Sequence, residues 1–376
     1  MGIYLDNAAT TYVYPEVLEV MKTYYRGDFF NPSAGYGDSR RVREDINAAR
    51  KTIADIINAE PEEIFFTSGG TESDNWVCNE AIKRGGHIIT STIEHKAMLM
   101  PISGYTRKNL IPPDEKGLIS IEKIRRAIRN DTVLVSIMTA NNEIGTIQPI
   151  KTIGEMLKEY GIMFHTDAVQ AFAHIPIDVK RLQVDLLSAS AHKFHGPKGC
   201  GFLYASKETG ISPFIAGGGQ EFGKRAGTEN VAGIVGMAYA ADISVKRMKK
   251  DNEWLLKIRD YITGRIFNEI EDVRINGDDK SRLSNNMNFS FKNVDGSALL
   301  VMLEIEGIYA SGGSACNVGN KMSYVLKEIN VPKEYIGGSI RLTTDAGITV
   351  KEADYVVYKL KQCVKQLREK SKPPEK

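Results

Sequence analysis

The stretch Val184-Asp185-Leu186-Leu187-Ser188-Ala189-Ser190-Ala191-His192-Lys193-Phe194-His195-Gly196 places a lysine shortly after the apolar run 184–187. At the end of a buried strand, the Lys193 amine is partly desolvated and still within reach of a ligand. A lysine in this environment can form a Schiff base with an aldehyde. Upstream, His165 and Asp167 close a second apolar run. An aldehyde-binding lysine and a carboxylate for a pyridinium nitrogen are the minimal electron-sink pair, so the two segments predict a pyridoxal 5'-phosphate site.

Short apolar runs alternate with helical patterns over most of the chain. This rhythm predicts an α/β fold with a doubly wound, mostly parallel sheet. Polar clusters follow several of the runs, at the edge where open α/β sheets bind ligands. The expected strands are residues 64–67, 87–90, 133–138, 163–165, 186–188 and 201–204, and a helix is expected over 153–160.

A glycine turn, Ser68-Gly69-Gly70-Thr71-Glu72-Ser73, follows the first of these strands. We expect a helix to begin after it, near Asp74 or Asn75. A helix start with glycines offers free backbone N–H groups and close approach, which suits a phosphate. An ordinary strand-to-helix turn is the alternative, because the spacing matches neither a Walker nor a dinucleotide loop.

The pattern changes near Asp251 to a long helical stretch, followed by a strand around 288–291, a helix at 298–304 and a strand around 339–342. We therefore expect a large cofactor-binding domain over residues 14–250. Residues 1–13 and 251–376 would form a smaller α+β domain. In the last helix, a stripe of Val356, Leu360, Val364 and Leu367 indicates core packing rather than a partner site.

Composition excludes several function classes. The 376 residues include 49 Lys and Arg against 47 Asp and Glu, and the basic residues are scattered, which gives nucleic-acid or anionic-membrane binding little support. No run approaches the length of a membrane span and no secretory signal is visible, so we expect a cytosolic protein. The four cysteines form no CxxC pair, and neither a zinc site nor a disulfide framework is indicated.

Several sequence blocks, taken together, resemble one family. The chain is similar to the cysteine desulfurases, fold-type I enzymes of the class-V aminotransferase group that feed sulfur to iron–sulfur cluster and thiolated-tRNA pathways. The similarity covers nearly the whole chain. The matching blocks are residues 4–11, 31–33, 67–75, 94–96, 141–145, 167–170, 190–199, 217–230, 311–316 and 339–341.

The resemblance implies roles around the cofactor ring. Lys193 would bind the cofactor aldehyde, and Asp167 would keep the pyridine nitrogen protonated. His95 would stack on the ring and assist proton transfer, while Gln170 and Asn142 would bind its phenolic oxygen. Without the block around it, His95 would be read as an ordinary satisfied histidine.

The resemblance also implies a phosphate cradle and a homodimer. Gly70, Thr71, Ser190 and His192 match the residues of the cradle in one chain. Thr228 matches a residue that reaches the phosphate from the second subunit. A local cap in a glycine-rich turn is the alternative for Thr228.

For the amino-acid carboxylate, the resemblance assigns Arg341, with Asn31 as a second contact. Arginine's planar fork can hold a carboxylate with two parallel bonds. A surface ion pair is the ordinary alternative for an isolated arginine.

Cys316 would carry the distinctive chemistry. It lies in Ser311-Gly312-Gly313-Ser314-Ala315-Cys316-Asn317, a run of small and polar residues that predicts an exposed, mobile loop. A thiolate there can attack the sulfur of a bound L-cysteine, leaving a persulfide for an acceptor protein. The acceptor, an iron–sulfur scaffold or a tRNA-thiolation enzyme, is left open. We expect the other cysteines, Cys78, Cys200 and Cys363, to be packing residues.

Two other functions compete with this interpretation. Another class-V enzyme, an aminotransferase or a selenocysteine lyase, would share Lys193 and Asp167 but would not depend on Cys316. A binding protein that keeps the pocket as a relic is the second, and intact Lys193, Asp167 and Arg341 argue against it. The chain also departs from the usual family pattern at His195, a position that more often holds tyrosine, glycine or alanine.

Overall fold

Seven strands form the larger of two main sheets in the computed structural model, which describes residues 2–312 and 322–370. The order is β2-β8-β7-β6-β5-β3-β4, and only β8 runs antiparallel to its neighbours. The predicted doubly wound, mostly parallel sheet is confirmed. Its strands are β2 (Ile64–Thr67), β3 (His87–Ser91), β4 (Lys108–Ile111), β5 (Thr132–Ser136), β6 (Met163–Asp167), β7 (Leu186–Ser190) and β8 (Gly201–Ala205).

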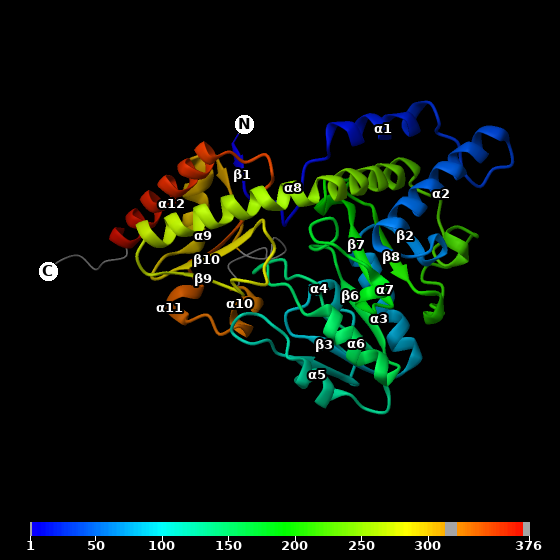
Figure 1. Ribbon diagram of the computed structural model, residues 1–376, viewed down its shortest axis with the longest axis horizontal. Helices are drawn as coiled ribbons and strands as arrows, with labels where there is room; N and C mark the ends of the chain where they lie inside the picture. The colour runs from blue at the N-terminus through cyan, green and yellow to red at the C-terminus, as the bar shows by residue number, and fades with distance from the viewer. Residues whose placement is uncertain (1, 313–321, 371–376) are drawn as a thin grey trace.

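Apart from the edge strand β4, the strands of this sheet are almost entirely buried, because helices cover both faces (Figure 1). Neighbouring side chains of one strand enter different hydrophobic clusters: Phe66 packs with α2 (Gly37–Ile57), and Phe65 packs with Trp76 of α3 (Gly70–Arg84). The period-2 alternation of a strand accounts for this division. Both clusters exclude water from the strands, whose carboxyl ends form the edge at which open α/β sheets bind ligands.

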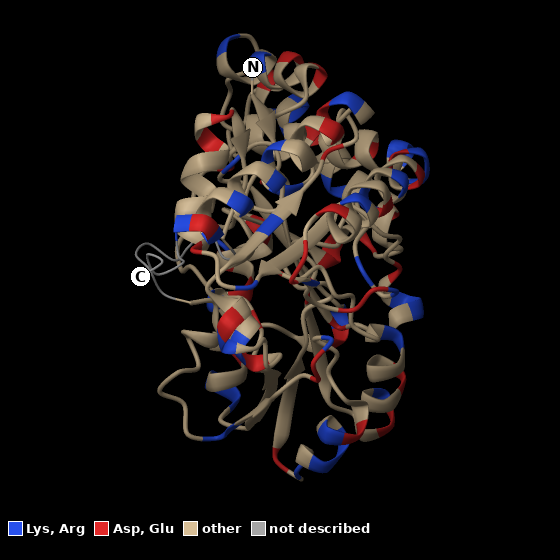
Figure 2. Cartoon of the chain, turned by 90° about the vertical axis from the view of Figure 1, so that its left-hand side faces the viewer, with Lys and Arg blue, Asp and Glu red and all other residues tan. Residues whose placement is uncertain are grey.

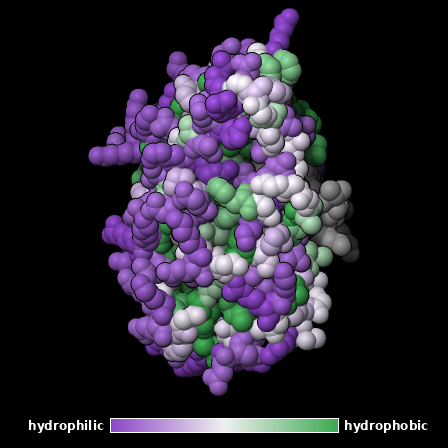
Figure 3. All heavy atoms as spheres, turned by 90° about the vertical axis from the view of Figure 1, so that its right-hand side faces the viewer, coloured by the Kyte–Doolittle hydropathy of each residue, from purple (hydrophilic) through white to green (hydrophobic). Residues whose placement is uncertain are grey.

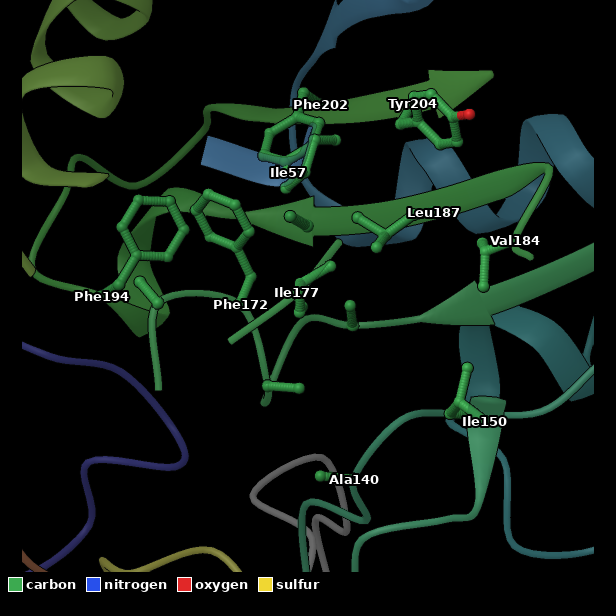
Figure 4. Packing of buried hydrophobic residues seen from close by; sticks show 14 of the residues in the cluster. Ile57, Ala140, Ile150, Phe172, Ile177, Val184, Leu187, Phe194, Phe202 and Tyr204 are labelled. Carbon is green, nitrogen blue, oxygen red and sulfur yellow. The ribbon is translucent and has the colours of Figure 1, made fainter. Parts of the chain in front are cut away.

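An aromatic trio anchors the turns that follow β6 and β7. Phe172 meets Phe194 and Phe202 edge-to-face, with ring centroids 4.9 and 5.1 Å apart. All three rings are fully buried, and Figure 4 shows Phe172 beside Phe194, with Phe202 above them. Such pairs contribute roughly 0.5–1.5 kcal/mol each beyond area burial. Because Phe194 follows Lys193 directly, this packing fixes the turn that carries the lysine.

A second, antiparallel sheet lies beside the first, in the order β12-β10-β9. Its strands are β9 (Val273–Ile275), β10 (Asn286–Phe291) and β12 (Ser339–Thr343), and a parallel pair, β1 (Ile3–Tyr4) with β11 (Ile308–Tyr309), adjoins it. Two helices, α9 (Gly296–Ile305) and α12 (Val350–Lys370), complete its core. Val356, Leu360 and Val364 are buried there and Leu367 packs against them, so the predicted core stripe is confirmed.

One long helix, α8 (Val231–Glu269), spans both sheets (Figure 1). The expected start near Asp251 is wrong: the helix begins twenty residues earlier, and the expected domain boundary at 250/251 falls inside it. Its first half, with Ala232 and Met237, belongs to the core of the large sheet. Its second half, with Ile258 and Ile262, belongs to the core of the small sheet. The side chains of α8 therefore change cores close to residue 250.

The remaining elements are short or peripheral. They are α1 (Pro15–Arg26), α4 (Lys96–Leu99), α5 (Ile121–Ala127), α6 (Ile150–Tyr160), α7 (Val179–Leu182), α10 (Tyr324–Glu328), α11 (Lys333–Ile336) and four 3-10 turns. Charges of both signs alternate over the helices in Figure 2, and Figure 3 shows hydrophilic side chains interleaved with small hydrophobic groups. None of the helices in the described part of the chain has the length and apolar character of a membrane span.

Candidate active site

A cavity of about 530 Å³ lies where β2, β5, β6 and β7 end. It brings together ten of the predicted site residues, whereas Asn31 and Thr228 do not line it. The lining includes Gly70, Thr71, His95, Asn142, Asp167, Gln170, Ser190, His192, Lys193 and Arg341. The cavity is thus lined by residues at the ends of four strands of the large sheet and by Arg341 of the second sheet.

Lys193 ends a 3-10 turn (Ala191–Lys193) directly after β7. Its Nζ donates to the backbone oxygens of Ala8 and Ala9, at 2.6 and 2.8 Å. The Ala8 oxygen also accepts from Gln170 Nε2 at 2.9 Å. The N-terminal segment therefore holds the amine at the cavity wall. Sequence reasoning missed this role of Ala8 and Ala9, because carbonyl acceptors carry no residue signature.

Asp167 lies at the end of β6 and is buried, with Oδ1 accepting from the backbone N–H of Val169 at 2.8 Å. Burial raises the pKa of Asp167, although His95 and Lys193 nearby act to lower it. A second buried carboxyl group, Asp74 on α3, has its pKa raised further by burial and by the charge of Asp167. A cationic ring nitrogen in the cavity would offset the cost of keeping Asp167 ionised.

The turn between β2 and α3 is shaped for close approach by a ligand. Gly69 has φ +149°, a conformation that favours glycine, and a Cβ on Gly70 would lie 2.5 Å from Val169 Cγ2. The helix begins at Gly70 rather than near Asp74, because the Gly69 oxygen already accepts from the N–H groups of Glu72 and Ser73. The first residues of this fifteen-residue helix, Gly70, Thr71 and Glu72, line the cavity, where a helix start suits an anion.

Burial lowers the pKa of two histidines of the cavity, His95 and His192. For His95, the charge of Asp167 opposes this shift and Lys193 adds to it. Its Nδ1 accepts from the backbone N–H of Ala97 at 3.2 Å, so the neutral ring carries its proton on Nε2. Burial and Lys193 also lower the pKa of His192, to about 4. Its Nδ1 lies 3.1 Å from Thr10 Oγ1.

The residues present fit pyridoxal phosphate. The cavity joins a lysine amine, a buried carboxyl group and a helix start, and Asn142 adds a buried Oδ1 that has no hydrogen-bond partner among the described residues. Such an unpaired amide is costly without a ligand, and the phenolic end of the cofactor is polar. No group of three or more His, Cys, Asp or Glu side chains in the described ranges could hold a metal ion.

Arg341 reaches the cavity from β12 of the second sheet. Its guanidinium donates to the Asn142 backbone oxygen at 2.8 Å and to Asp6 Oδ1 at 2.6 Å. The side chain is 1% exposed, and its Nε has no partner in the described part of the chain. A buried arginine with an open donor beside a lysine amine suits a ligand that carries a carboxylate.

Two predicted residues, Asn31 and Thr228, lie elsewhere, and a third, Cys316, is not among the described residues. Asn31 is exposed between α1 and α2, where its side chain caps the N–H of Ser33. Thr228 lines a separate cavity of about 220 Å³ that shares Ser68 and Gly199 with the first. Cys316 and the expected mobile loop around it lie outside the described residues. Cys78, Cys200 and Cys363 are buried, as their expected packing role requires.

Comparison with known proteins matches residues 3–354 to the family model of the class-V aminotransferases. A protein of Clostridium botulinum named cysteine desulfurase IscS is 47% identical over 380 residues, covering 98% of this chain and 96% of its own. A solved structure described as a NifS-like protein superposes with a TM-score of 0.92 at 36% identity, covering 98% of this chain and all of the other. Another, described as SspA in complex with cysteine, gives 0.80 at 36% identity, covering 92% and 99%.

The fold and the lysine–carboxylate cavity thus agree with the class that the family model defines. The chain belongs to the class-V aminotransferase family and, within it, to the cysteine desulfurases.

Proposed function

We propose that the chain uses pyridoxal 5'-phosphate to convert L-cysteine to L-alanine. The sulfur would be held as a persulfide on Cys316 and passed to an acceptor protein for iron–sulfur cluster assembly or tRNA thiolation. The observation that carries the proposal is the shared cavity of Lys193, Asp167 and Arg341. The similarity to proteins named cysteine desulfurase, and to one solved with cysteine, supports the choice of substrate.

The cofactor would be held at three points. Lys193 would bind its aldehyde, and Asp167 would bind its ring nitrogen. The start of α3 would bind its phosphate together with Ser190 and His192. His95 would cover the ring, while Asn142 and Gln170 would bind the phenolic oxygen. When bound, the cofactor supplies an electron sink that makes the Cα proton of an amino acid acidic.

The chain's own residues would then orient the substrate and move its protons. Arg341 binds the carboxylate, which places Cα near the Lys193 amine. Lys193 Nζ, held close to Ala8 and Ala9, takes the proton from Cα. The ring of His95 assists this proton transfer. Arg341 is buried and Lys193 and His95 are half-buried, which limits the access of water to the reacting carbon.

Cys316 would perform the sulfur transfer. Its thiolate attacks the substrate sulfur, so that a Cys316 S–S bond forms while the substrate Cβ–S bond breaks. The electron pair of the broken bond stays with the carbon skeleton, which takes up protons and leaves as L-alanine. No external oxidant is needed, since the sulfur moves as a neutral atom.

We also propose that two chains form a homodimer in the cytoplasm, with Thr228 of each chain reaching the phosphate site of the other. Thr228 lines a cavity next to the main one, and this position supports the proposal. The division into a large domain (14–250) and a small domain (1–13 and 251–376) is supported by the change of core along α8.

The proposal is tested by incubating the cofactor-loaded protein with L-cysteine and measuring alanine, sulfide and protein persulfide. Cys316→Ala should keep the yellow colour and the spectral change on adding L-cysteine, and should form no persulfide. Cys363→Ala is the matched control and should behave as the wild type. Persulfide at normal levels in Cys316→Ala would refute the role assigned to Cys316. Full turnover of the amino acid in Cys316→Ala, with no persulfide in either protein, would favour another class-V activity, such as that of an aminotransferase or a selenocysteine lyase.

A further inference from the structure

His195, where the chain departs from the usual family pattern, lies two residues beyond Lys193 in an unusual backbone conformation. Its φ is +64°, which is unfavourable for a residue other than glycine. Neighbouring residues hold it there: its N–H donates to Thr11 Oγ1 at 2.8 Å and its oxygen accepts from the Tyr14 N–H at 3.1 Å. The imidazole stacks on the Tyr14 ring, with centroids 4.1 Å apart and planes at 9°. The ring is therefore held in one orientation.

Both ring nitrogens of His195 face acceptors. Nδ1 lies 3.1 Å from the backbone oxygen of Tyr12, and Nε2 lies 3.3 Å from Oδ2 of Asp345. A carbonyl oxygen and a carboxylate can only accept, so the arrangement is satisfied fully when both nitrogens carry a proton. The contact with Asp345 is then an ion pair, and both of its side chains are largely shielded from solvent.

Asp345 belongs to the segment that follows β12. Its carboxylate also accepts from the Gly347 N–H at 2.7 Å. Burial acts to raise the pKa of Asp345, but the bonds from His195 and Gly347 outweigh it and the pKa lies below its ordinary value. The other titratable groups around the pair are Tyr12, Tyr14, His174, Arg247 and Asp251.

The pair joins the two elements that must cooperate on one amino acid. His195 is fixed to the Lys193 turn, whose backbone oxygen lies 3.0 Å from His174 Nε2. Asp345 is four residues beyond Arg341. A cavity of about 50 Å³ adjoins the pair at the boundary between the Lys193 turn and the segment after β12. Apolar side chains therefore do not fill this boundary between the two sheets. The His195–Asp345 contact is a direct side-chain link across it.

We infer that His195 and Asp345 form a positioning pair that sets the separation between the Lys193 amine and the Arg341 guanidinium, and thereby the affinity for α-amino acids with a free carboxylate. The inference rests on the proposed function, since it deepens the role of the same site. Neither residue touches the substrate; each acts through the neighbour it holds.

The test compares wild type, His195→Phe, Asp345→Asn and the double variant, all loaded with pyridoxal phosphate. Phenylalanine keeps a ring to stack on Tyr14, and asparagine keeps the shape of Asp345. The quantities measured are KM and kcat for L-cysteine, the dissociation constant of L-alanine from the visible absorbance, and the dissociation constant of the cofactor. Glu16→Gln, which removes the exposed pair with Arg247, is the control.

Each single variant should raise KM and the L-alanine dissociation constant about fivefold, with kcat and cofactor affinity within about twofold of wild type. The double variant should have the same KM and L-alanine dissociation constant as the single variant that binds more weakly, because each single substitution already removes the one interaction between His195 and Asp345. Unchanged L-alanine binding in Asp345→Asn, or effects that multiply in the double variant, would overturn the inference. If His195→Phe fails to fold, Asp345→Asn alone decides.

The two proposals fail differently. A wild-type protein that responds to L-alanine but forms no sulfide from L-cysteine refutes the desulfurase proposal, and the L-alanine measurements still decide on the pair. A protein that responds to neither amino acid refutes both.

Discussion

Arg341 Nη2 donates to Asp6 Oδ1 at 2.6 Å, which ties the last strand of the small sheet to a segment near the start of the chain. The second amino group of the same guanidinium binds the Asn142 backbone oxygen. Nε, which is buried, has no hydrogen-bond partner among the described residues. Asp6 and Asn142 together fix the orientation of this guanidinium, which lines the same cavity as Lys193.

Replacing Arg341 with lysine should raise KM for L-cysteine at least about tenfold and leave the cofactor absorbance unchanged. A single ammonium group cannot hold Asp6 and Asn142 and also offer a planar fork to a carboxylate. Steady-state kinetics and visible spectra check this. Arg126→Lys, at the exposed ion pair with Glu122, serves as the control, and an unaltered KM in Arg341→Lys would remove Arg341 from substrate binding.

Asp167→Asn should lower kcat by roughly 100-fold or more and weaken cofactor binding, because the amide has no charge to keep a pyridine nitrogen protonated. Asp74→Asn should cost less, about tenfold at most, since Asp74 acts through Asp167. Turnover and the cofactor dissociation constant are the quantities to measure. A larger loss in Asp74→Asn than in Asp167→Asn would reverse the assignment of the two carboxyl groups.

Gly70→Ala should weaken cofactor binding about fivefold, since the new Cβ would stand 2.5 Å from Val169 Cγ2 and the turn would have to shift. Val169→Ala in the same chain should restore most of the affinity by removing the colliding methyl group. The cofactor dissociation constants of the two single variants and the double variant test this. Failure of the second substitution to rescue the first would show that the Cβ obstructs the ligand itself.

Much of the large sheet could be predicted because its strands are buried on both faces. Residues 64–67 form β2 as expected, with every side chain buried. The edge strand β4 was missed: it begins with the polar Lys108 and Asn109, so no apolar run marks it, and Asn109 and Leu110 are exposed. The start of α8 was also missed. Its first turns, with Gly233 and Gly236, are rich in small residues and carry no amphipathic stripe.

The site residues also divide into those that a local sequence pattern marks and those that only the packing of the two sheets brings together. Lys193 and Asp167 could be found because each ends an apolar run, and both line the cavity. The contacts of Asp6 with Arg341 and of Asp345 with His195 join residues more than a hundred positions apart. No local pattern encodes such pairs. They arise only when the two sheets pack together, so the sequence alone offered no sign of them.

Glu94, beside His95, should make stability depend on pH. Burial raises the pKa of Glu94 to about 8, although Ser91 Oγ and the Met138 N–H bind its Oε1 and act to lower it. A raised carboxyl pKa contributes stability that is full below the unfolded value, near 4.5, and is lost as the pH rises to about 8. Thermal unfolding midpoints of wild type should therefore fall relative to Glu94→Gln between pH 5 and 8, then stay parallel above. Parallel curves from pH 5 onward would contradict a protonated Glu94.

The central claim is that Lys193 covalently holds pyridoxal phosphate. Reduction of the cofactor-loaded protein with borohydride, followed by proteolysis and mass spectrometry, tests it most directly. We predict a single pyridoxyl phosphate adduct on Lys193 and none in Lys193→Ala. An adduct on Lys198 or Lys96 instead, or no adduct on any lysine, would contradict the account.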